Sequence, residues 1–283
     1  MDTTSATAQG ILYVVATPIG NLDDISQRAI NTLKQVDTIL AEDTRHSLPL
    51  LTALGISKPV WSFHAHNEHE KTEIILHALK MGQSFALISD AGTPLISDPG
   101  FLLVKLARTA NIQITPIPGP CALVTALCAA GVPCDNFLFI GFPPAKQQAR
   151  LTKIKSLSQS EYTIVLYEST HRIRECVNTI TEVYGCDYEF VLAKELTKTF
   201  ERFIYANSNT IKAWLEENPA HIKGEFVIIL PARPVIKSDE EDKKLLTTLL
   251  KELPLKQAVK IASSLSSTAK NELYKLALDL QNR

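Results

Sequence analysis

The amino-acid sequence predicts an α/β protein in which two α/β domains precede a small helical domain. Short apolar runs alternate with helix-length segments from residue 11 to 140, glycine and paired prolines break the alternation at 141–147, and leucines recur at helical spacing after residue 244. The length of 283 residues also exceeds the ~250 residues at which single cores usually stop growing. We therefore expect domains at residues 1–142, 143–234 and 235–283.

The first domain is expected to contain a mainly parallel sheet with helices on both faces, because strands and helices alternate along the chain. Asp24 and Gln27 stand at capping-box spacing before the first helix, so Asp24 is expected to cap it. Helices are expected over 26–36, 67–81, 100–110 and 121–130. The expected strands are the apolar runs at residues 11–16, 38–41, 60–63, 85–88, 112–116 and 137–140.

The second domain should contain a partly antiparallel sheet, since fewer helices separate its later strands. Its expected strands are at 162–167, 190–193, 203–206 and 226–230, and its expected helices at 145–157, 171–184 and 208–217. The polar run KSDEEDKK at 237–244 is interpreted as a solvated linker. The remainder is expected to form helices with a break at Pro254.

Composition excludes several classes of protein. A net charge of −1 argues against bulk attraction to nucleic acid, so any RNA contact must come from local patches. No apolar stretch approaches ~18 residues and the N-terminus lacks the regions of a signal peptide, which predicts a cytoplasmic protein. The five cysteines include no CxxC pair, so neither a disulfide framework nor a structural zinc site is indicated.

The segment SDAGTPLISDPG at 89–100 follows the apolar run at 85–88 and is rich in turn-forming residues. This composition is typical of a ligand-binding loop at the end of a strand, although a tight connection without a ligand is the alternative. Similar segments follow other strands at 17–22, 42–45 and 116–122, so all should lie along one rim of the sheet. Neither GxGxxG nor GxxxxGK[ST] is present, so the rim suits a roughly neutral, hydrogen-bonding ligand better than a triphosphate.

Two groups of residues have the chemistry of metal ligands. Two aspartates lie in the 89–100 loop, and His64, His66 and His69 have a spacing that could bind zinc. No further oxygen-rich stretch, cysteine or acidic cluster completes either set, so no metal is expected.

Six motifs together closely resemble the ribosomal RNA small subunit methyltransferase I family, which has the tetrapyrrole methylase (class III methyltransferase) fold. They are TPIGNLDDISQRA at 17–29, AEDTR at 41–45, SDAGTPLISDPG at 89–100, PIPGPCA at 116–122, YESTHR at 167–172 and KELTKTFE at 194–201. The resemblance runs in order from about residue 11 to 230. The C-terminal helices are similar to the family's small terminal domain.

The resemblance implies a homodimeric enzyme that uses S-adenosyl-L-methionine to methylate the ribose 2′-oxygen of a cytidine. The substrate would lie in the decoding region of small-subunit (16S) ribosomal RNA, either naked or in the assembled 30S subunit. The implied cofactor-binding residues are Asp90, Ala91, Gly92, Thr93, Ile96, Ser97, Asp98, Pro120, Cys121, Ala122, Phe142, Pro144, Leu196 and Glu225, with Pro118 and Gly119 shaping the same wall.

An alcohol is a poor nucleophile, so a general base that removes its proton during methyl transfer should raise the rate by roughly 10² to 10⁴. The candidate bases are Asp43, Glu168, His171, Glu195 and Lys198. Asp43 stands beside Arg45, so it is either a base or one half of a structural ion pair. We hypothesise that Asp43 and Lys198, with Glu195, lie near the acceptor ribose.

Contacts to RNA are expected from basic patches, each of which is otherwise a solvated face. Arg45 and Lys194 lie beside the candidate catalytic residues, and seven lysines against two glutamates between 243 and 275 include Lys256 and Lys260. The other candidates are Lys146, Arg150, Lys153, Lys155, Arg172 and Arg174.

Two other functions remain open from the sequence. One is a methyltransferase of the same fold that acts on a tetrapyrrole precursor, and the other is a non-catalytic RNA-binding assembly protein. The basic C-terminal segment and the EDTR and KELTK segments favour RNA over a tetrapyrrole.

Overall fold

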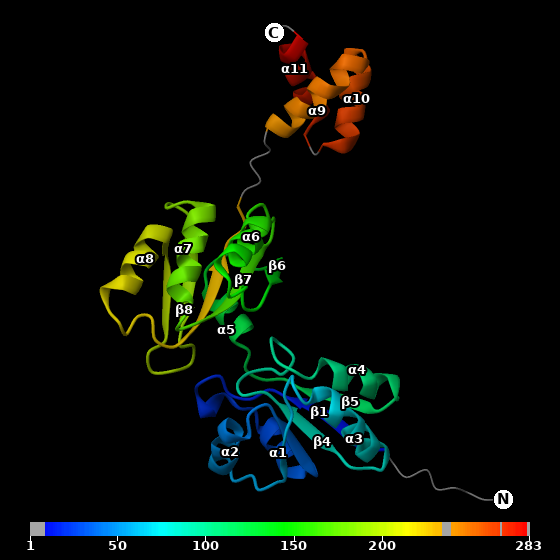
Figure 1. Cartoon of the computed structure of the whole chain (residues 1–283), viewed down its shortest axis with the longest axis vertical. Helices are drawn as coiled ribbons and strands as arrows, with labels where there is room; N and C mark the ends of the chain where they lie inside the picture. Colours follow the sequence, from blue (N-terminus) through cyan, green and yellow to red (C-terminus); the bar gives the residue numbers. More distant parts are fainter. Residues whose placement is uncertain (1–8, 234–238, 267, 282–283) are drawn as a thin grey trace, which may run out of the picture. The chain divides into compact units, whose positions relative to one another are not determined.

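A computed structural model describes residues 9–233, 239–266 and 268–281 of the chain (Figure 1). The protein consists of two compact units that meet in the sequence between Ala232 and Arg233. The described part of the larger unit contains two five-stranded sheets, and that of the smaller unit contains helices alone.

The first sheet is parallel throughout, as the alternating pattern predicted. Its strands have the order β3-β2-β4-β1-β5, so β1 and β4 lie side by side near its centre. Because all strands run the same way, the loops that follow them emerge at one edge. The strands are β1 (Ile11–Val15), β2 (Thr38–Ala41), β3 (Val60–Ser62), β4 (Phe85–Ile88) and β5 (Gln113–Ile117).

Helices cover both faces of this sheet, because neighbouring residues in a buried strand point to opposite sides. Ile39 and Ala41 pack with residues of α1 and α2, whereas Leu40 packs with residues of α3 and α4. The helices are α1 (Gln27–Gln35), α2 (Thr44–Ala53), α3 (Glu68–Lys80) and α4 (Phe101–Thr109) (Figure 1).

Two local features differ from the sequence prediction. The N-cap of α1 is Ser26, whose Oγ accepts a hydrogen bond from the amide of Ala29, so the prediction that Asp24 caps this helix is wrong. The helix α2 was not predicted, because the sequence after Asp43 has the character of a turn and Pro49 interrupts the helical pattern.

The second sheet is mixed, which confirms that part of it is antiparallel. Its strand order is β6-β7-β10-β8-β9, and only the β6–β7 pair among these is parallel. The strands are β6 (Phe137–Phe139), β7 (Thr163–Ser169), β8 (Glu189–Lys194), β9 (Arg202–Asn207) and β10 (Glu225–Leu230).

Both faces of the second sheet are also covered (Figure 1). The helices α6 (Gln147–Leu157), α7 (Ile173–Tyr184) and α8 (Ser208–Glu217) pack on one face. The helix α5 (Ala122–Ala129) packs on the other face through Leu123, Ala126 and Leu127.

The chain therefore changes sheets earlier than the sequence indicated. Strand β6 was expected in the first sheet, but it pairs with β7 in the second, and α5 packs on the second sheet as well. The crossing lies at residues 118–121, between β5 and α5, and the segment at 141–147 is an internal loop of the second half. An apolar run predicts a strand but carries no information on which neighbour it will pair with.

The smaller unit is built from α9 (Asp239–Glu252), α10 (Leu255–Leu265) and α11 (Lys270–Gln281). Its core contains Leu246, Val259 and Leu273, one from each helix. Helix α10 begins after Pro254, as predicted. The polar run at 237–244 is not a linker throughout, because α9 already begins at Asp239; residues 237 and 238 lie outside the described part. No helix in the described ranges is long and apolar enough to span a bilayer.

Arg150, which was expected to contact RNA, is instead a buried structural residue of α6. Only 1% of the residue is exposed. Its guanidinium donates to the carbonyl of Ala145 at 3.0 Å and to Thr179 Oγ1 at 3.2 Å, and forms an ion pair with Glu175 at 3.0 Å. The prediction of an RNA contact at Arg150 is therefore wrong, because this side chain joins α6 to α7.

Replacement of Arg150 by methionine should lower the free energy of unfolding by about 2–4 kcal/mol, because it removes three contacts of a buried side chain and leaves the buried Thr179 Oγ1 without its donor. Urea denaturation of the full chain would measure the change. The matched control is Glu175→Gln, whose side chain is 63% exposed and whose loss of charge should cost under ~1 kcal/mol. Equal stability of wild type and the Arg150→Met variant would show that the buried contacts contribute nothing.

Candidate functional site

The loops that follow β1 and β4 are joined by a pair of backbone hydrogen bonds. The amide of Thr17 donates to the carbonyl of Gly92 at 2.9 Å, and the amide of Gly92 donates to the carbonyl of Thr17 at 3.0 Å. Gly92 has a φ of +80°, and a Cβ at this position would lie 3.2 Å from Ile19 Cγ2. Thr93 Oγ1 extends the connection by donating to the carbonyl of Pro120 at 3.0 Å. The three rim loops therefore form one connected structure.

A fourth rim segment, EDTR, is attached through Asp90. Asp90 Oδ1 accepts from the amide of Asp43 at 3.0 Å, and its Oδ2 lies 3.2 Å from His46 Nδ1. Asp43 in turn caps α2 by accepting from the amide of Arg45, and its carboxylate lies 2.6 Å from Arg45 Nη2. The Arg45 side chain remains 87% exposed. Asp90 thus helps to fix the position of Asp43 and Arg45, the residues predicted for catalysis and for RNA contact.

The second half of the larger unit contributes the loop at 195–201, between β8 and β9. Lys198 Nζ lies 2.9 Å from both Glu195 Oε1 and Glu225 Oε2. This loop contacts the first half at Gly20, where an added Cβ would lie 2.4 Å from Lys198 Cγ and 3.1 Å from the carbonyl oxygen of Leu196. Gly20 therefore allows a close approach that no larger residue would permit without movement.

Backbone strain is concentrated in these two facing loops. Leu95 and Ser97 in the 89–100 loop have φ of 72° and 74°, and Glu195 and Thr197 in the 195–201 loop have φ of 51° and 65°. Left-handed conformations at side-chain-bearing residues cost of the order of 1 kcal/mol or more each and persist where the surroundings over-determine them. Such strain commonly marks binding sites, and here it occurs on opposite sides of one cavity.

A cavity of about 440 Å³ lies between these loops, and most of the predicted cofactor residues line it. Those are Asp90, Ala91, Gly92, Thr93, Ile96, Ser97, Asp98, Cys121, Ala122, Phe142, Leu196 and Glu225. Two predicted residues, Pro120 and Pro144, do not line the cavity. The carbonyl of Pro120 accepts the hydrogen bond from Thr93, and Pro144 is exposed.

The lining also includes residues that were not predicted to bind a cofactor. Ile19, Glu42 and residues 167–169 lie in motifs that are visible in the sequence, so they could have been predicted. Phe226 and Val227 lie in β10 and carry no signal in the sequence, because they resemble ordinary core residues of a strand.

Tyr167 supports one wall of this cavity. Its hydroxyl accepts from the amide of Leu123 at 2.9 Å, at the start of α5, and its ring contacts that of Phe142 at 5.8 Å between centroids. Burial raises the pKa of Tyr167 far above its ordinary value, so it remains a neutral phenol. Arg172, expected to contact RNA, donates to the carbonyl of Pro143 and pairs with the buried Glu168, so it holds the Phe142 segment in place.

Three carboxylates give the cavity an acidic side. Burial, followed by the negative charge of Glu42, raises the pKa of Asp98 to about 6. Burial, followed by the charge of Asp90, also raises the pKa of Glu42. The carboxylates of Glu42, Asp90 and Asp98 therefore repel one another, and a cationic group bound beside them would relieve that repulsion.

The three predicted catalytic residues lie in two ion-pair networks. The hydrogen bond from the Arg45 side chain lowers the pKa of Asp43 to about 2. Burial alone would raise the pKa of Glu195, but hydrogen bonds from Lys198 and the Glu225 amide outweigh it and lower that pKa. For Lys198 the directions are reversed: burial alone would lower its pKa, but its hydrogen bonds to Glu225 and Glu195 outweigh burial and raise it. All three side chains are thus held charged at neutral pH.

Lys194 does not extend this charged group. It is only 7% exposed, burial lowers its pKa, and its Nζ donates to the carbonyl of Ala220 at 2.8 Å. The interpretation of Lys194 as a residue that grips RNA phosphates is therefore wrong.

The histidines of the segment at 64–69 form no metal site in the structure. The His64 ring lies 3.2 Å from the Asn67 side chain, and its centroid is 5.9 Å from that of His66. Among the described residues, no group of three or more His, Cys, Asp or Glu side chains could hold a metal ion.

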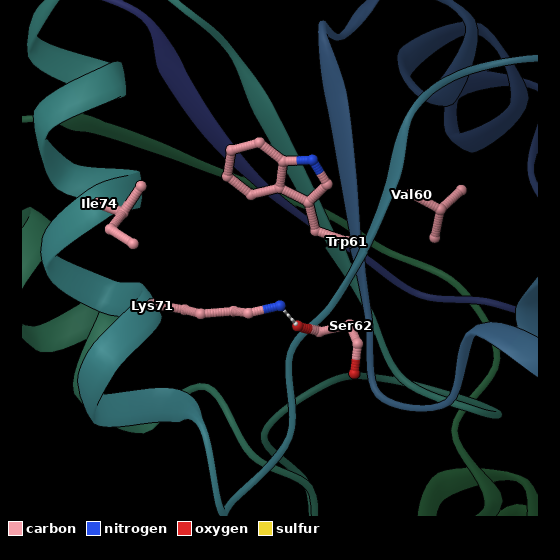
Figure 2. Close-up of a pocket in the computed structure, with 5 residues that line it drawn as sticks. All are labelled: Val60, Trp61, Ser62, Lys71 and Ile74. Atoms are coloured by element: carbon pink, nitrogen blue, oxygen red, sulfur yellow. Dashed lines mark hydrogen bonds between the residues drawn. The ribbon is translucent and has the colours of Figure 1, made fainter.

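A second cavity, of about 400 Å³, lies at the edge strand β3 (Figure 2). It is lined by Val60, Trp61, Ser62, Lys71 and Ile74, and Lys71 Nζ donates to the carbonyl of Ser62 at 2.6 Å. Figure 2 shows Lys71 reaching across from α3 to this carbonyl. The contact satisfies a carbonyl of the edge strand, so we infer that Lys71 hinders pairing of this edge with a strand of another chain.

Comparison with known proteins relates the chain to two families. The family of Tetrapyrrole (Corrin/Porphyrin) Methylases matches residues 11–212, and the RsmI C-terminal HTH domain matches residues 237–281. The chain is 49% identical over 275 residues to Ribosomal RNA small subunit methyltransferase I of Haemophilus influenzae, covering 95% of this chain and 96% of the relative. It is 46% identical to the protein of that name from Escherichia coli O157:H7, covering 97% and 96%.

Solved structures show the same fold at low sequence identity. Diphthine synthase superimposes with a TM-score of 0.59 at 12% identity, covering 78% of this chain and 90% of that one. Uroporphyrin-III-C-methyltransferase from Thermus thermophilus gives 0.56 at 17% identity, covering 78% and 94%. Together with the family matches, they confirm the predicted fold class.

The raised pKa of Asp98 predicts a pH-dependent stability. The pKa of Asp98 in the folded state, about 6, lies above its ordinary value of 3.8, so the folded state binds this proton more tightly than the unfolded state. The stability that this proton contributes is fully present below pH 3.8 and is lost as pH rises through about 6. Asp98→Asn should therefore be more stable than wild type at pH 7.5 by about 1 kcal/mol, a value discounted because the carboxylate is partly exposed.

Urea denaturation of both proteins at pH 4.5 and 7.5 would measure this difference, which should be smaller at the lower pH. Glu42→Gln should also be more stable than wild type at pH 7.5, since burial raises the pKa of Glu42 as well. Parallel stability profiles of wild type and Asp98→Asn across this range would contradict the electrostatic description of the cavity.

Proposed function

The chain belongs to the ribosomal RNA small subunit methyltransferase I family, and on that premise we propose that it transfers a methyl group from S-adenosylmethionine to the 2′-oxygen of a cytidine ribose in the decoding region of 16S ribosomal RNA. The family relationship confirms the resemblance predicted from the six motifs. The observation that carries the proposal is that motifs distant in sequence, at 17–29, 41–45, 89–100, 116–122, 167–172 and 194–201, converge on one cavity.

The cavity fits S-adenosylmethionine in size and in chemistry. Its volume of about 440 Å³ lies within the range of small-molecule sites. Asp90 and Asp98 offer negative charge to a cationic ligand, while Phe142 and Leu196 offer apolar surface. The turns of the 89–100 loop provide backbone hydrogen-bonding groups. When bound, the sulfonium supplies a methyl group that is already activated for transfer, so the protein's task is alignment.

We propose that Asp43, Glu195 and Lys198 position the acceptor ribose, and that its hydroxyl proton passes to solvent water and not to any of these three side chains. A carboxylate with a pKa of about 2, such as Asp43, is a weak base at neutral pH. Lys198 is protonated and bonded to two carboxylates, which leaves it able to donate but not to accept a proton. These charged groups can hold a ribose or a phosphate in a defined orientation beside the cavity.

RNA contacts would come from exposed cations outside the cavity. The Arg45 side chain is 87% exposed beside Asp43, and Lys146 is exposed at the start of α6. In the smaller unit, Lys256 and Lys260 are exposed one helical turn apart on α10. The match of this unit to a helix-turn-helix family domain supports a role in binding nucleic acid.

The proposed reaction can be tested with purified components. With radiolabelled S-adenosylmethionine, 30S subunits from cells that lack the gene should accept one methyl group per subunit, and subunits from cells that carry it should accept almost none. The label should remain in an alkali-resistant dinucleotide, because 2′-O-methylation blocks hydrolysis of the adjacent phosphodiester bond. Label in a base, or transfer to a tetrapyrrole precursor and not to RNA, would contradict the proposal.

Substitution of Asp43 or Lys198 by alanine should lower turnover roughly 10- to 100-fold at saturating cofactor, because each removes a positioning contact. Binding of S-adenosylhomocysteine, measured by calorimetry, should change little. Lys80→Ala is the control, since this lysine is exposed in the last turn of α3 with no ion pair among the described residues. Unchanged turnover in both test variants would remove these residues from the mechanism.

A further inference from the structure

Phe200 presents an aromatic ring to solvent at the end of the 195–201 loop. The residue is 74% exposed, which is more than other large hydrophobic side chains of the described ranges. Burial of such a ring is worth roughly 2–3 kcal/mol, so its exposure is a cost to the folded chain that a bound partner would remove.

The loop that carries Phe200 is held in one conformation by its own hydrogen bonds. The amide of Thr197 donates to Glu201 Oε2 at 2.6 Å, which closes the segment that contains Phe200. The amides of Lys198 and Glu201 donate to the carbonyls of Glu195 and Lys198, each at 3.0 Å. With the left-handed residues Glu195 and Thr197, these bonds form a compact double turn. Phe200 is therefore displayed from an ordered platform, which reduces the entropy lost when a ligand packs on it.

The same loop reaches the candidate active site. Leu196 lines the cavity, and the Lys198 stem contacts Gly20 of the first half. Phe200 itself is not part of the cavity lining, so its ring is available to a ligand other than the cofactor. Arg202, two residues further along the chain, is exposed at the start of β9 and carries a positive charge.

We propose that Phe200 is a stacking platform for an unpaired base of the RNA substrate, adjacent to the nucleotide that is methylated. The proposal rests on the proposed function and specifies how its substrate is recognised. Proteins that recognise RNA by sequence bind splayed, unpaired bases and stack them on aromatic side chains, with nearby cations on the phosphates. Stacking at Phe200 would anchor the strand while Lys198, in the same loop, orients the acceptor ribose.

The test compares Phe200→Ala, Phe200→Leu and Phe200→Trp in the full-length protein, with 30S subunits from cells that lack the gene. Alanine and leucine should lower kcat/KM for the subunit roughly 5- to 150-fold, whereas tryptophan should stay within about threefold of wild type, because an aromatic face is what binds a base. The expected loss lies in KM and in subunit binding measured with S-adenosylhomocysteine present. The affinity for S-adenosylhomocysteine and the thermal midpoint should not change.

Tyr205→Ala is the matched control, since Tyr205 is a 58% exposed aromatic residue of β9 outside the loop, and it should behave as wild type. The inference is overturned if leucine restores wild-type kinetics, if tryptophan fails as alanine does, or if alanine weakens cofactor binding to the same extent. If wild type methylates the subunits and all Phe200 variants match it, the inference falls and the proposed function stands. Ring-dependent binding without methyl transfer would reject the proposed function alone.

Discussion

The backbone pair between Thr17 and Gly92 is the contact on which the organisation of this protein depends. It joins the loops after β1 and β4, two strands that are neighbours in the sheet but separated by more than seventy residues in sequence. Once these loops are joined, Thr93 can reach Pro120 and Asp90 can reach the amide of Asp43. A parallel sheet brings such loops to one edge, but only these contacts turn the edge into a continuous surface.

The second half closes that surface into a cavity. The 195–201 loop approaches the β1 loop at Gly20, and strained residues stand on both sides of the space between them. The pre-formed shape suits a reaction whose donor is already activated, because alignment of two reactants then supplies much of the rate. The charged residues are also separated by sign. Acidic side chains line the cavity, whereas Arg45 and Lys198 lie outside its lining.

The sequence was sufficient where local chemistry decides the structure. Buried strands are visible as apolar runs, and rim loops are visible as clusters of glycine, proline and aspartate, so a ligand-binding loop at 89–100 could be predicted from composition. The individual cofactor residues were implied by the resemblance to the methyltransferase family, and most of them line the cavity. The sequence was insufficient where contacts with residues distant in the chain decide the structure. Nothing in the sequence around Arg150 shows that Glu175 and Thr179 will surround it, and nothing in the run at 137–139 shows that it will pair with β7. Phe226 and Val227 line the cavity with residues that suit any strand core.

We infer that the joined rim loops and the 195–201 loop form the cofactor site before the cofactor binds. A crystal structure of the full chain with S-adenosylhomocysteine tests this most directly. The ligand should lie in the cavity bordered by Gly92, Asp98 and Leu196, with the Thr17–Gly92 hydrogen bonds unchanged. A ligand bound elsewhere, or a site that forms only after those hydrogen bonds break, would contradict this inference.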